Sequence, residues 1–249
     1  MIGVPTIAEN LELVKARIAQ AAAKSQRSVD DIELMAVTKT HSAEAVRAAI
    51  DAGHSLFGES KVQEARAKIP LLPSNLHWHF IGHLQKNKVR HALPLFELIH
   101  GVDSLELAQA IDRIAQDDGL HPRVLLEVNM AGEASKFGFQ PENLRQEMES
   151  LLALPRLSIE GLMCIPPLGQ EAETSRKYFV TLRELRDSFE NEFELKLPHL
   201  SMGMTNDYAV AIEEGATLVR VGTAIFGERP KRQKSKATDE HGFSTISDS

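Results

Sequence analysis

The stretch LMAVTKTH, residues 34–41, decides the fold: it begins as an apolar run and ends around a lysine, Lys39. An apolar run of this length is typical of a strand buried on both faces, as in parallel sheets. A helical pattern follows at once, with Ser42 as its N-cap and Gly53 at its end. Ser104 and Thr205 are predicted in the same way to cap the helical patterns that follow the fourth and seventh β-rich runs. The stretch therefore predicts a strand–helix unit in which the strand ends on an amine.

Eight such β-rich runs occur along the chain, and most are separated by apolar residues at i, i+3, i+4 spacing. Strands separated by helices pair in parallel, and right-handed crossovers place the helices outside. We therefore expect an α/β fold, a single (β/α)8 (TIM) barrel, with an extra amphipathic helix at about residues 6–26 that covers its bottom. An open doubly wound sheet is the alternative, but the turn VTKTHS lacks the glycines of its phosphate loop. The runs are 32–39, 56–60, 77–83, 98–104, 123–129, 157–165, 199–204 and 218–227.

Composition and charge exclude several classes of protein. The chain has 249 residues and a net charge of −7, which argues against a nucleic-acid or anionic-membrane binder. Its single cysteine, Cys164, excludes an internal disulfide and a multi-cysteine zinc site. The sequence shows neither a signal-peptide pattern nor a membrane-spanning run, so we expect a cytoplasmic protein. Residues 1–229 are expected to form the barrel, without a second domain, and the polar residues 230–249 a disordered tail.

Lys39 is expected at the C-terminal end of the first strand, where (β/α)8 barrels carry their active sites. Apolar surroundings lower the pKa of a lysine, and the neutral amine forms Schiff bases with carbonyl compounds. The alternative is a lysine that extends from the strand end into solvent.

The ends of the last two predicted strands carry small and hydroxyl residues, namely Ser201, Met202, Gly222 and Thr223. Barrels commonly bind phosphate at the loops after strands seven and eight, and helix N-termini attract anions. Ordinary glycine turns would leave the same pattern. Combined with a Schiff-base lysine, this phosphate site suggests a phosphorylated aldehyde, of which pyridoxal 5'-phosphate (PLP) is the obvious example.

Arg220 lies within the last apolar strand, where a guanidinium needs an acceptor. Opposite a pyridine nitrogen it would keep that nitrogen unprotonated and weaken the cofactor as an electron sink. The alternative is an ion pair with a buried carboxylate, Glu127 or Glu160.

His77, His79 and His83 alternate in the third run, as metal ligands on a strand do. No carboxylate cluster accompanies them, so we interpret them as structural histidines, place His83 near the cofactor, and expect no metal site.

Four segments together resemble the pyridoxal 5'-phosphate homeostasis protein family, over residues 8–229: AVTKTHSAEAVRAAIDAGHSLFGES, HWHFIGHLQKNK, NMAGEASKFG and HLSMGMTNDYAVAIEEGATLVRVGTAIFGER. The resemblance implies a type III PLP fold, similar to the N-terminal domain of alanine racemase, with the cofactor held as a Schiff base on Lys39. It implies that Lys136 assists cofactor release or transfer. Ser60 stands where the family usually has asparagine, and its shorter side chain lacks the amide donors for a contact to the cofactor ring. The phosphate is expected around Ser201, Met202, Gly222 and Thr223, with Arg220 near the pyridine nitrogen.

The function implied by the resemblance is intracellular vitamin B6 (PLP) homeostasis without robust catalysis. We expect a monomer that delivers the cofactor to PLP-requiring apo-enzymes and has no catalytic residues of its own. A PLP-dependent amino-acid racemase or decarboxylase is the alternative, although the two tyrosines, Tyr178 and Tyr208, fall within helical patterns. A class I aldolase would share the Schiff-base lysine but would not need the phosphate site.

Overall fold

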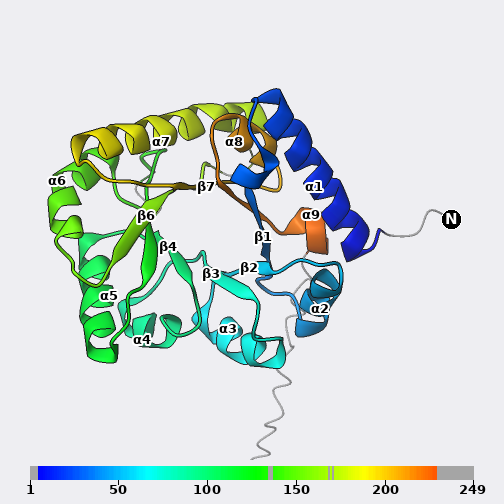
Figure 1. The fold of residues 1–249 in the computed structure, drawn as a ribbon, viewed down its shortest axis with the longest axis horizontal. Coiled ribbons are helices and arrows are strands. Elements are labelled where there is room, and N and C mark those ends of the chain that lie inside the picture. The colour runs from blue at the N-terminus through cyan, green and yellow to red at the C-terminus, as the bar shows by residue number, and fades with distance from the viewer. Residues whose placement is uncertain (1–4, 134–136, 168, 170, 229–249) are drawn as a thin grey trace, which may run out of the picture.

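The computed structural model describes residues 5–133, 137–167, 169 and 171–228. Eight parallel strands close into a barrel in chain order, with β1 next to β8 (Figure 1). This confirms the predicted (β/α)8 barrel and excludes the open doubly wound sheet. The strands are β1 Glu33–Val37, β2 Leu56–Glu59, β3 His77–Phe80, β4 Leu98–Val102, β5 Arg123–Glu127, β6 Ser158–Met163, β7 His199–Met204 and β8 Leu218–Val221.

Several strands end earlier than the apolar runs that predicted them. β1 ends at Val37, so Lys39 lies in the turn after the strand and is not its last residue. β3 ends at Phe80, which leaves His83 in a loop. The residues after Val221 form a short helix instead of continuing the strand. Apolar residues continue into the loops because the mouth of the barrel is itself partly buried, so hydrophobicity alone does not mark the strand ends.

Helices surround the barrel, as Figure 1 shows. The predicted caps Ser42 and Ser104 accept hydrogen bonds from Ala45 N–H and Leu107 N–H. Thr205 was predicted to cap the helix after β7, but the residue at that N-cap is Asp207. The helices are α1 Ile7–Lys24, α2 Ala43–Asp51, α3 Val62–Lys68, α4 Val89–Ala92, α5 Leu105–Asp118, α6 Pro141–Leu152, α7 Ala172–Glu192, α8 Tyr208–Glu213 and α9 Thr223–Phe226.

The N-terminal helix α1 lies in the outer layer and does not cover the bottom of the barrel, contrary to the prediction. It packs against α2, α8 and α9 beside the seam where β1 meets β8 (Figure 1). Asn10 Nδ2 donates to Ile225 O at 3.0 Å, and Arg27 Nη1 donates to Ala216 O at 2.7 Å. Because α9 has only four residues, α1 supplies the helical cover that this seam otherwise lacks.

Two apolar clusters form the core: a large one between the barrel and the helices, and a small one inside the barrel. Polar side chains are also buried among the strands, and His100, Ser201 and Arg220 are at most 3% exposed. Such groups are costly to bury without hydrogen-bond partners, so their contacts are informative. The inner cluster contains Met35, Leu98, Leu125, Met163 and Leu218. Across the described ranges, no helix combines the length and the hydropathy that crossing a membrane requires.

Candidate functional site

A cavity of about 220 Å³ opens at the C-terminal ends of the strands, and we call it the mouth cavity. It brings together four of the predicted residues: Lys39, Arg220, Gly222 and Thr223. Ser175, Thr205 and Asn206 line it as well, and the sequence did not indicate that they would. The remaining lining residues are Val37, Ile81, Ile165, Pro167, Gly169, Met204 and Asp207.

Lys39 is partly buried, lies in the turn that follows β1, and lines the mouth cavity. The next residue, Thr40, has a φ of 68°, a left-handed conformation that is strained for a branched side chain. Its N–H donates to Glu64 Oε2 at 3.0 Å, which holds the turn in place. The backbone on the C-terminal side of Lys39 is thus fixed from α3.

A buried ion pair fixes the backbone on the other side of Lys39. Lys68 Nζ lies 2.5 Å from Glu59 Oε1 and donates to Thr38 O at 2.8 Å. Thr38 Oγ1 also donates to Glu59 Oε1, at 2.7 Å. Glu59 is fully buried, and its Oε2 has no hydrogen-bond partner among the described residues. We call these three residues the Glu59–Lys68 network.

Arg220 is almost fully buried, and neutral oxygen atoms hold its guanidinium. Nη1 donates to Ser201 O at 2.7 Å and to Ser201 Oγ at 2.6 Å, and Nη2 donates to Cys164 O at 2.9 Å. Burial lowers the pKa of Arg220. Two of its five N–H groups have no partner among the described residues, and Arg220 lines the mouth cavity.

The carboxylates predicted as alternative partners of Arg220 have other surroundings. Glu160 pairs with Arg123, 2.7 Å away, at the opposite end of the barrel. Glu127 is buried, and burial, together with the nearby Asp103, raises its pKa to about 7. Within the described part of the chain, no ion pair joins Arg220 to a carboxylate. Its positive charge therefore acts on the mouth cavity without a contacting counter-ion.

Ser201 and Met202 do not line the mouth cavity, although the sequence placed the phosphate on them. Both are fully buried, and the Ser201 hydroxyl meets Arg220 and, at 2.8 Å, His100 Nδ1. Ser201 faces the interior of the barrel and Met202 belongs to the apolar cluster between the barrel and the helices, so loop residues beyond β7 line the cavity instead. Ser201 positions Arg220.

His83 and Ser60 also lie outside the lining of the mouth cavity. His83 Nδ1 bonds Asp103 Oδ2 at 2.8 Å, and its ring stacks on Phe137 with centroids 3.7 Å apart. Ser60 follows β2, and its backbone packs closely against Gly82, because a Cβ at Gly82 would lie 2.2 Å from Ser60 O. The other predicted residue, Lys136, falls outside the described residues.

The cysteine and the two tyrosines lie outside the lining of the mouth cavity. Cys164 is fully buried, and burial raises the pKa of its thiol to about 12. Neither Tyr178 nor Tyr208 lines the mouth cavity. The ring of Tyr208, in α8, packs under the guanidinium of Arg17, in α1. Among the residues that the structure describes, no three His, Cys, Asp or Glu side chains form a group that could hold a metal ion.

The fold and the mouth cavity define a class of protein, the alanine-racemase-type barrel. Residues 7–230 match the family model of the alanine racemase N-terminal domain. The chain is 44% identical over 222 residues to a protein of Aquifex aeolicus called pyridoxal phosphate homeostasis protein, covering 89% of this chain and 97% of that one. A protein of the same name from Pseudomonas aeruginosa is 45% identical over 228 residues, covering 90% and 96%. The chain belongs to the pyridoxal phosphate homeostasis protein family.

Solved structures agree with this assignment. PipY of Synechococcus elongatus without PLP matches with a TM-score of 0.81 and 40% identity, covering 89% of this chain and all of that chain. The same protein with PLP bound matches with a TM-score of 0.77 and 41% identity. Alanine racemase of Clostridium difficile matches at a TM-score of 0.71 but at 18% identity, over 61% of its chain, and this likeness shows the fold alone.

Proposed function

We propose that this protein binds pyridoxal 5'-phosphate in the mouth cavity and serves the intracellular homeostasis of that cofactor. One observation carries the proposal: a single cavity gathers the Lys39 amine, the Arg220 guanidinium and the Thr223 hydroxyl. The names of the relatives and the PLP-bound form of PipY support it.

The chemistry of the lining fits each part of the cofactor. Lys39 Nζ would bond the aldehyde carbon, with loss of water. Arg220 would face the pyridine nitrogen with an N–H group that Ser201 leaves available. When bound, PLP supplies an electrophilic carbon and an electron-withdrawing ring.

The phosphate would lie between the loops that follow β7 and β8, on the hydroxyls of Thr205 and Thr223. Gly222 brings the second loop close to the turn that carries Lys39, because a Cβ there would be 3.3 Å from Val37 O. Ser201 is replaced in this assignment by Thr205, since its hydroxyl is buried against Arg220.

Arg220 supports a binding role over a catalytic one. An acidic partner would keep the pyridine nitrogen protonated and stabilise a carbanion at a bound amino acid, and a guanidinium cannot do so. We therefore infer that the protein holds and gives up its cofactor and does not act as a racemase or decarboxylase.

Reduction of the PLP-loaded protein with borohydride tests the covalent site. We expect the label on the peptide that contains Lys39, and no label after Lys39→Ala. Lys61→Ala is the matched control, because Lys61 is exposed and pairs with Glu64, yet lies near the same end of the barrel. Labelling that survives Lys39→Ala would contradict the assignment.

Two assays separate binding from catalysis. Mixed with a PLP-requiring apo-enzyme, the loaded protein should restore its activity, and mixed with L-alanine it should produce no D-alanine. Turnover of about 1 per second or faster would favour the racemase alternative. Transfer through Lys136, the monomeric state and the cytoplasmic location stay predictions.

A further inference from the structure

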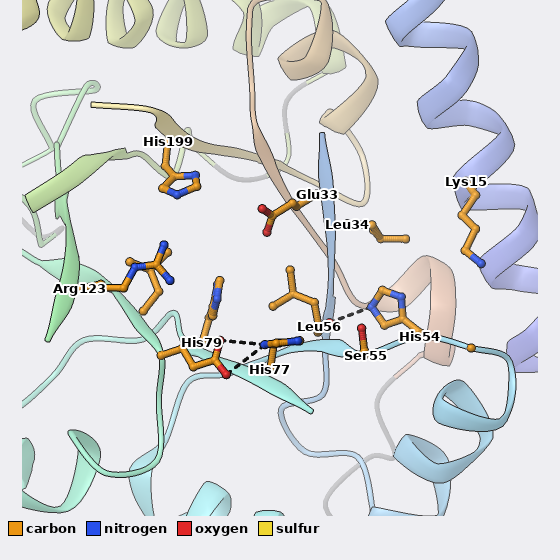
Figure 2. A pocket seen from close by; sticks show the side chains of 13 residues that line it. Lys15, Glu33, Leu34, His54, Ser55, Leu56, His77, His79, Arg123 and His199 are labelled. Atoms are coloured by element: carbon orange, nitrogen blue, oxygen red, sulfur yellow. Dashed lines mark hydrogen bonds and ion pairs between the residues drawn. The ribbon is translucent and has the colours of Figure 1, made fainter. Parts of the chain in front are cut away.

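A second and larger cavity, of about 590 Å³, lies at the opposite end of the barrel. The first residues of six strands line it, namely Glu33, Leu56, His77, Leu98, Arg123 and His199, and we call it the bottom cavity. Figure 2 shows the rings of His77, His79 and His199 and the side chains of Glu33 and Arg123 around one space. This end of a (β/α)8 barrel usually serves stability, so a cavity ringed by titratable groups needs an explanation.

A chain of hydrogen bonds runs from the bottom cavity through the barrel to Arg220. His79 Nδ1 is 3.1 Å from His100 Nε2, and His100 Nδ1 is 2.8 Å from Ser201 Oγ. Arg220 Nη1 donates to the same Ser201 oxygen at 2.6 Å. All four side chains are at most 5% exposed, and they occupy positions where barrels normally place branched apolar residues.

Arg220 fixes the direction of every bond in this chain, because a guanidinium can only donate. Ser201 Oγ accepts from Arg220, and its own hydrogen has His100 Nδ1 as the acceptor within reach. His100 then carries its hydrogen on Nε2 and donates to His79 Nδ1. The opposite direction would bury the Ser201 hydrogen without an acceptor, at a cost of about 1–3 kcal/mol.

The last hydrogen in the chain therefore sits on His79 Nε2. His79 is 5% exposed and lines the bottom cavity, and its Nε2 has no partner among the described residues. Burial lowers the pKa of His79 to about 3, so the ring is neutral and carries this single N–H. The bottom cavity is thus presented with an N–H donor that has no acceptor among the described residues.

The other polar groups of the cavity have described partners or lie at its rim. His54 Nε2 donates to Leu56 O at 2.8 Å, and His77 Nδ1 bonds Glu97 at 2.9 Å. Lys15 and Arg123 supply positive charge, but each is paired with a carboxylate, Glu12 or Glu160, and the lining residue Glu97 adds negative charge. Glu33 supplies negative charge and lies close enough to His199 to act on its titration.

We propose that the bottom cavity binds a small organic anion, a carboxylate or a phosphate monoester, whose oxygen accepts the hydrogen bond from His79 Nε2. Glu33 and Glu97 favour a ligand whose remote end is cationic or a hydrogen-bond donor. The volume suits a metabolite-sized molecule. Because hydrogen bonds in a row polarise one another, an anion here tightens the hold of Ser201 on Arg220.

Nitrogen-15 NMR of the histidine rings in the full chain, without cofactor, tests the proposal. Before any ligand is added, His79 and His100 should both be the Nε2–H tautomer. Inorganic phosphate and acetate are then titrated separately, and a shift of the His79 Nε2 resonance at millimolar concentrations is expected with at least one of them. An anion in the mouth cavity would also act on His79 through the chain, so the His79→Phe variant, which leaves the mouth cavity unchanged, assigns the response to the bottom cavity. The test stands even if PLP binding fails.

Three variants sharpen the outcome. His79→Phe should weaken binding of the responding anion roughly tenfold to a hundredfold, the effect of losing one hydrogen bond to a charged group. His77→Gln, which alters the same cavity outside the chain, should change it by less than about twofold. Ser201→Ala should weaken it roughly twofold to fivefold from a distance, because the tautomer of His79 is then no longer fixed. An Nδ1–H tautomer at His79, no response to either anion, or equal affinity in wild type and His79→Phe would overturn the proposal.

Discussion

The two ends of the barrel differ in the groups that contact their positively charged side chains. At the bottom, Arg123 meets Glu160 at 2.7 Å and His77 meets Glu97 at 2.9 Å. At the mouth, Arg220 is bonded only to neutral oxygen atoms within the described structure, and a buried lysine–glutamate pair lies behind the lysine turn. Exposed ion pairs contribute little to stability, whereas buried charges are costly unless each contact is kept. We therefore expect the buried charges at the mouth to affect stability more than the ion pairs at the bottom do.

The largest expected effect comes from breaking the Glu59–Lys68 network. Lys68→Met leaves the fully buried Glu59 without its cation, so the free energy of unfolding should fall by about 3–5 kcal/mol. Urea denaturation at neutral pH measures it. Arg123→Gln is the matched control at the bottom, where the half-exposed pair should lose less than about 1 kcal/mol. Similar losses in the two variants would refute the contrast between the ends.

Glu127 tests the electrostatics of the mouth through pH. Its pKa is raised to about 7, so between the unfolded pKa and pH 7 the unfolded chain ionises while the folded one stays protonated. Stability is therefore lost as the pH rises, and the penalty is complete above pH 7. Glu127→Gln removes the penalty and should stabilise the protein by about 3 kcal/mol at pH 8 but only about 1 kcal/mol at pH 5.

Urea denaturation of both proteins at the two pH values measures the difference. Glu142→Gln, in the first turn of the outer helix α6, serves as the control for the substitution itself. A gain for Glu127→Gln that does not grow between pH 5 and pH 8 would mean that this carboxyl titrates normally.

The smallest expected effect concerns the hydroxyls of Thr205 and Thr223, which we propose to hold the phosphate. Thr205→Ala or Thr223→Ala should each cost about 1.5–3 kcal/mol of PLP binding, or roughly tenfold to a hundredfold in Kd. Affinity for unphosphorylated pyridoxal should hardly change. Fluorescence titration with the two ligands measures both values. Thr181→Ala, on the outer helix α7, is the control, and equal losses for both ligands would place the phosphate elsewhere.

The architecture was predictable from the sequence because strand and helix periods alternate eight times, and the motif around Lys39 excluded the open sheet. The cavity residues Lys39, Arg220, Gly222 and Thr223 were predictable as well, since parallel strands bring their C-terminal ends to one edge.

The sequence was less informative where side-chain direction decides which residues line the cavity. Ser201 lies on β7, and its hydroxyl points into the core toward Arg220. His83 lies beyond β3 and bonds Asp103 outside the mouth cavity. Thr205, assigned as a helix cap, lines the mouth cavity instead. The row of hydrogen bonds from His79 to Arg220 joins residues 141 positions apart, and no local sequence pattern predicts such contacts.

The helix α1 has a consequence for the order of events during synthesis. Its partners α8 and α9, and the strand β8 that pairs with β1, come from the last part of the chain. With roughly 185 residues between Glu33 and its partner Leu218, a ribosome adding about 5–20 residues per second takes roughly 10–40 s to supply them. During that interval the apolar face of α1, including Leu11, Val14 and Ile18, lacks its partners α8 and α9. The newborn chain therefore exposes part of this apolar face until its last part has been made, although the folded protein buries these residues almost completely.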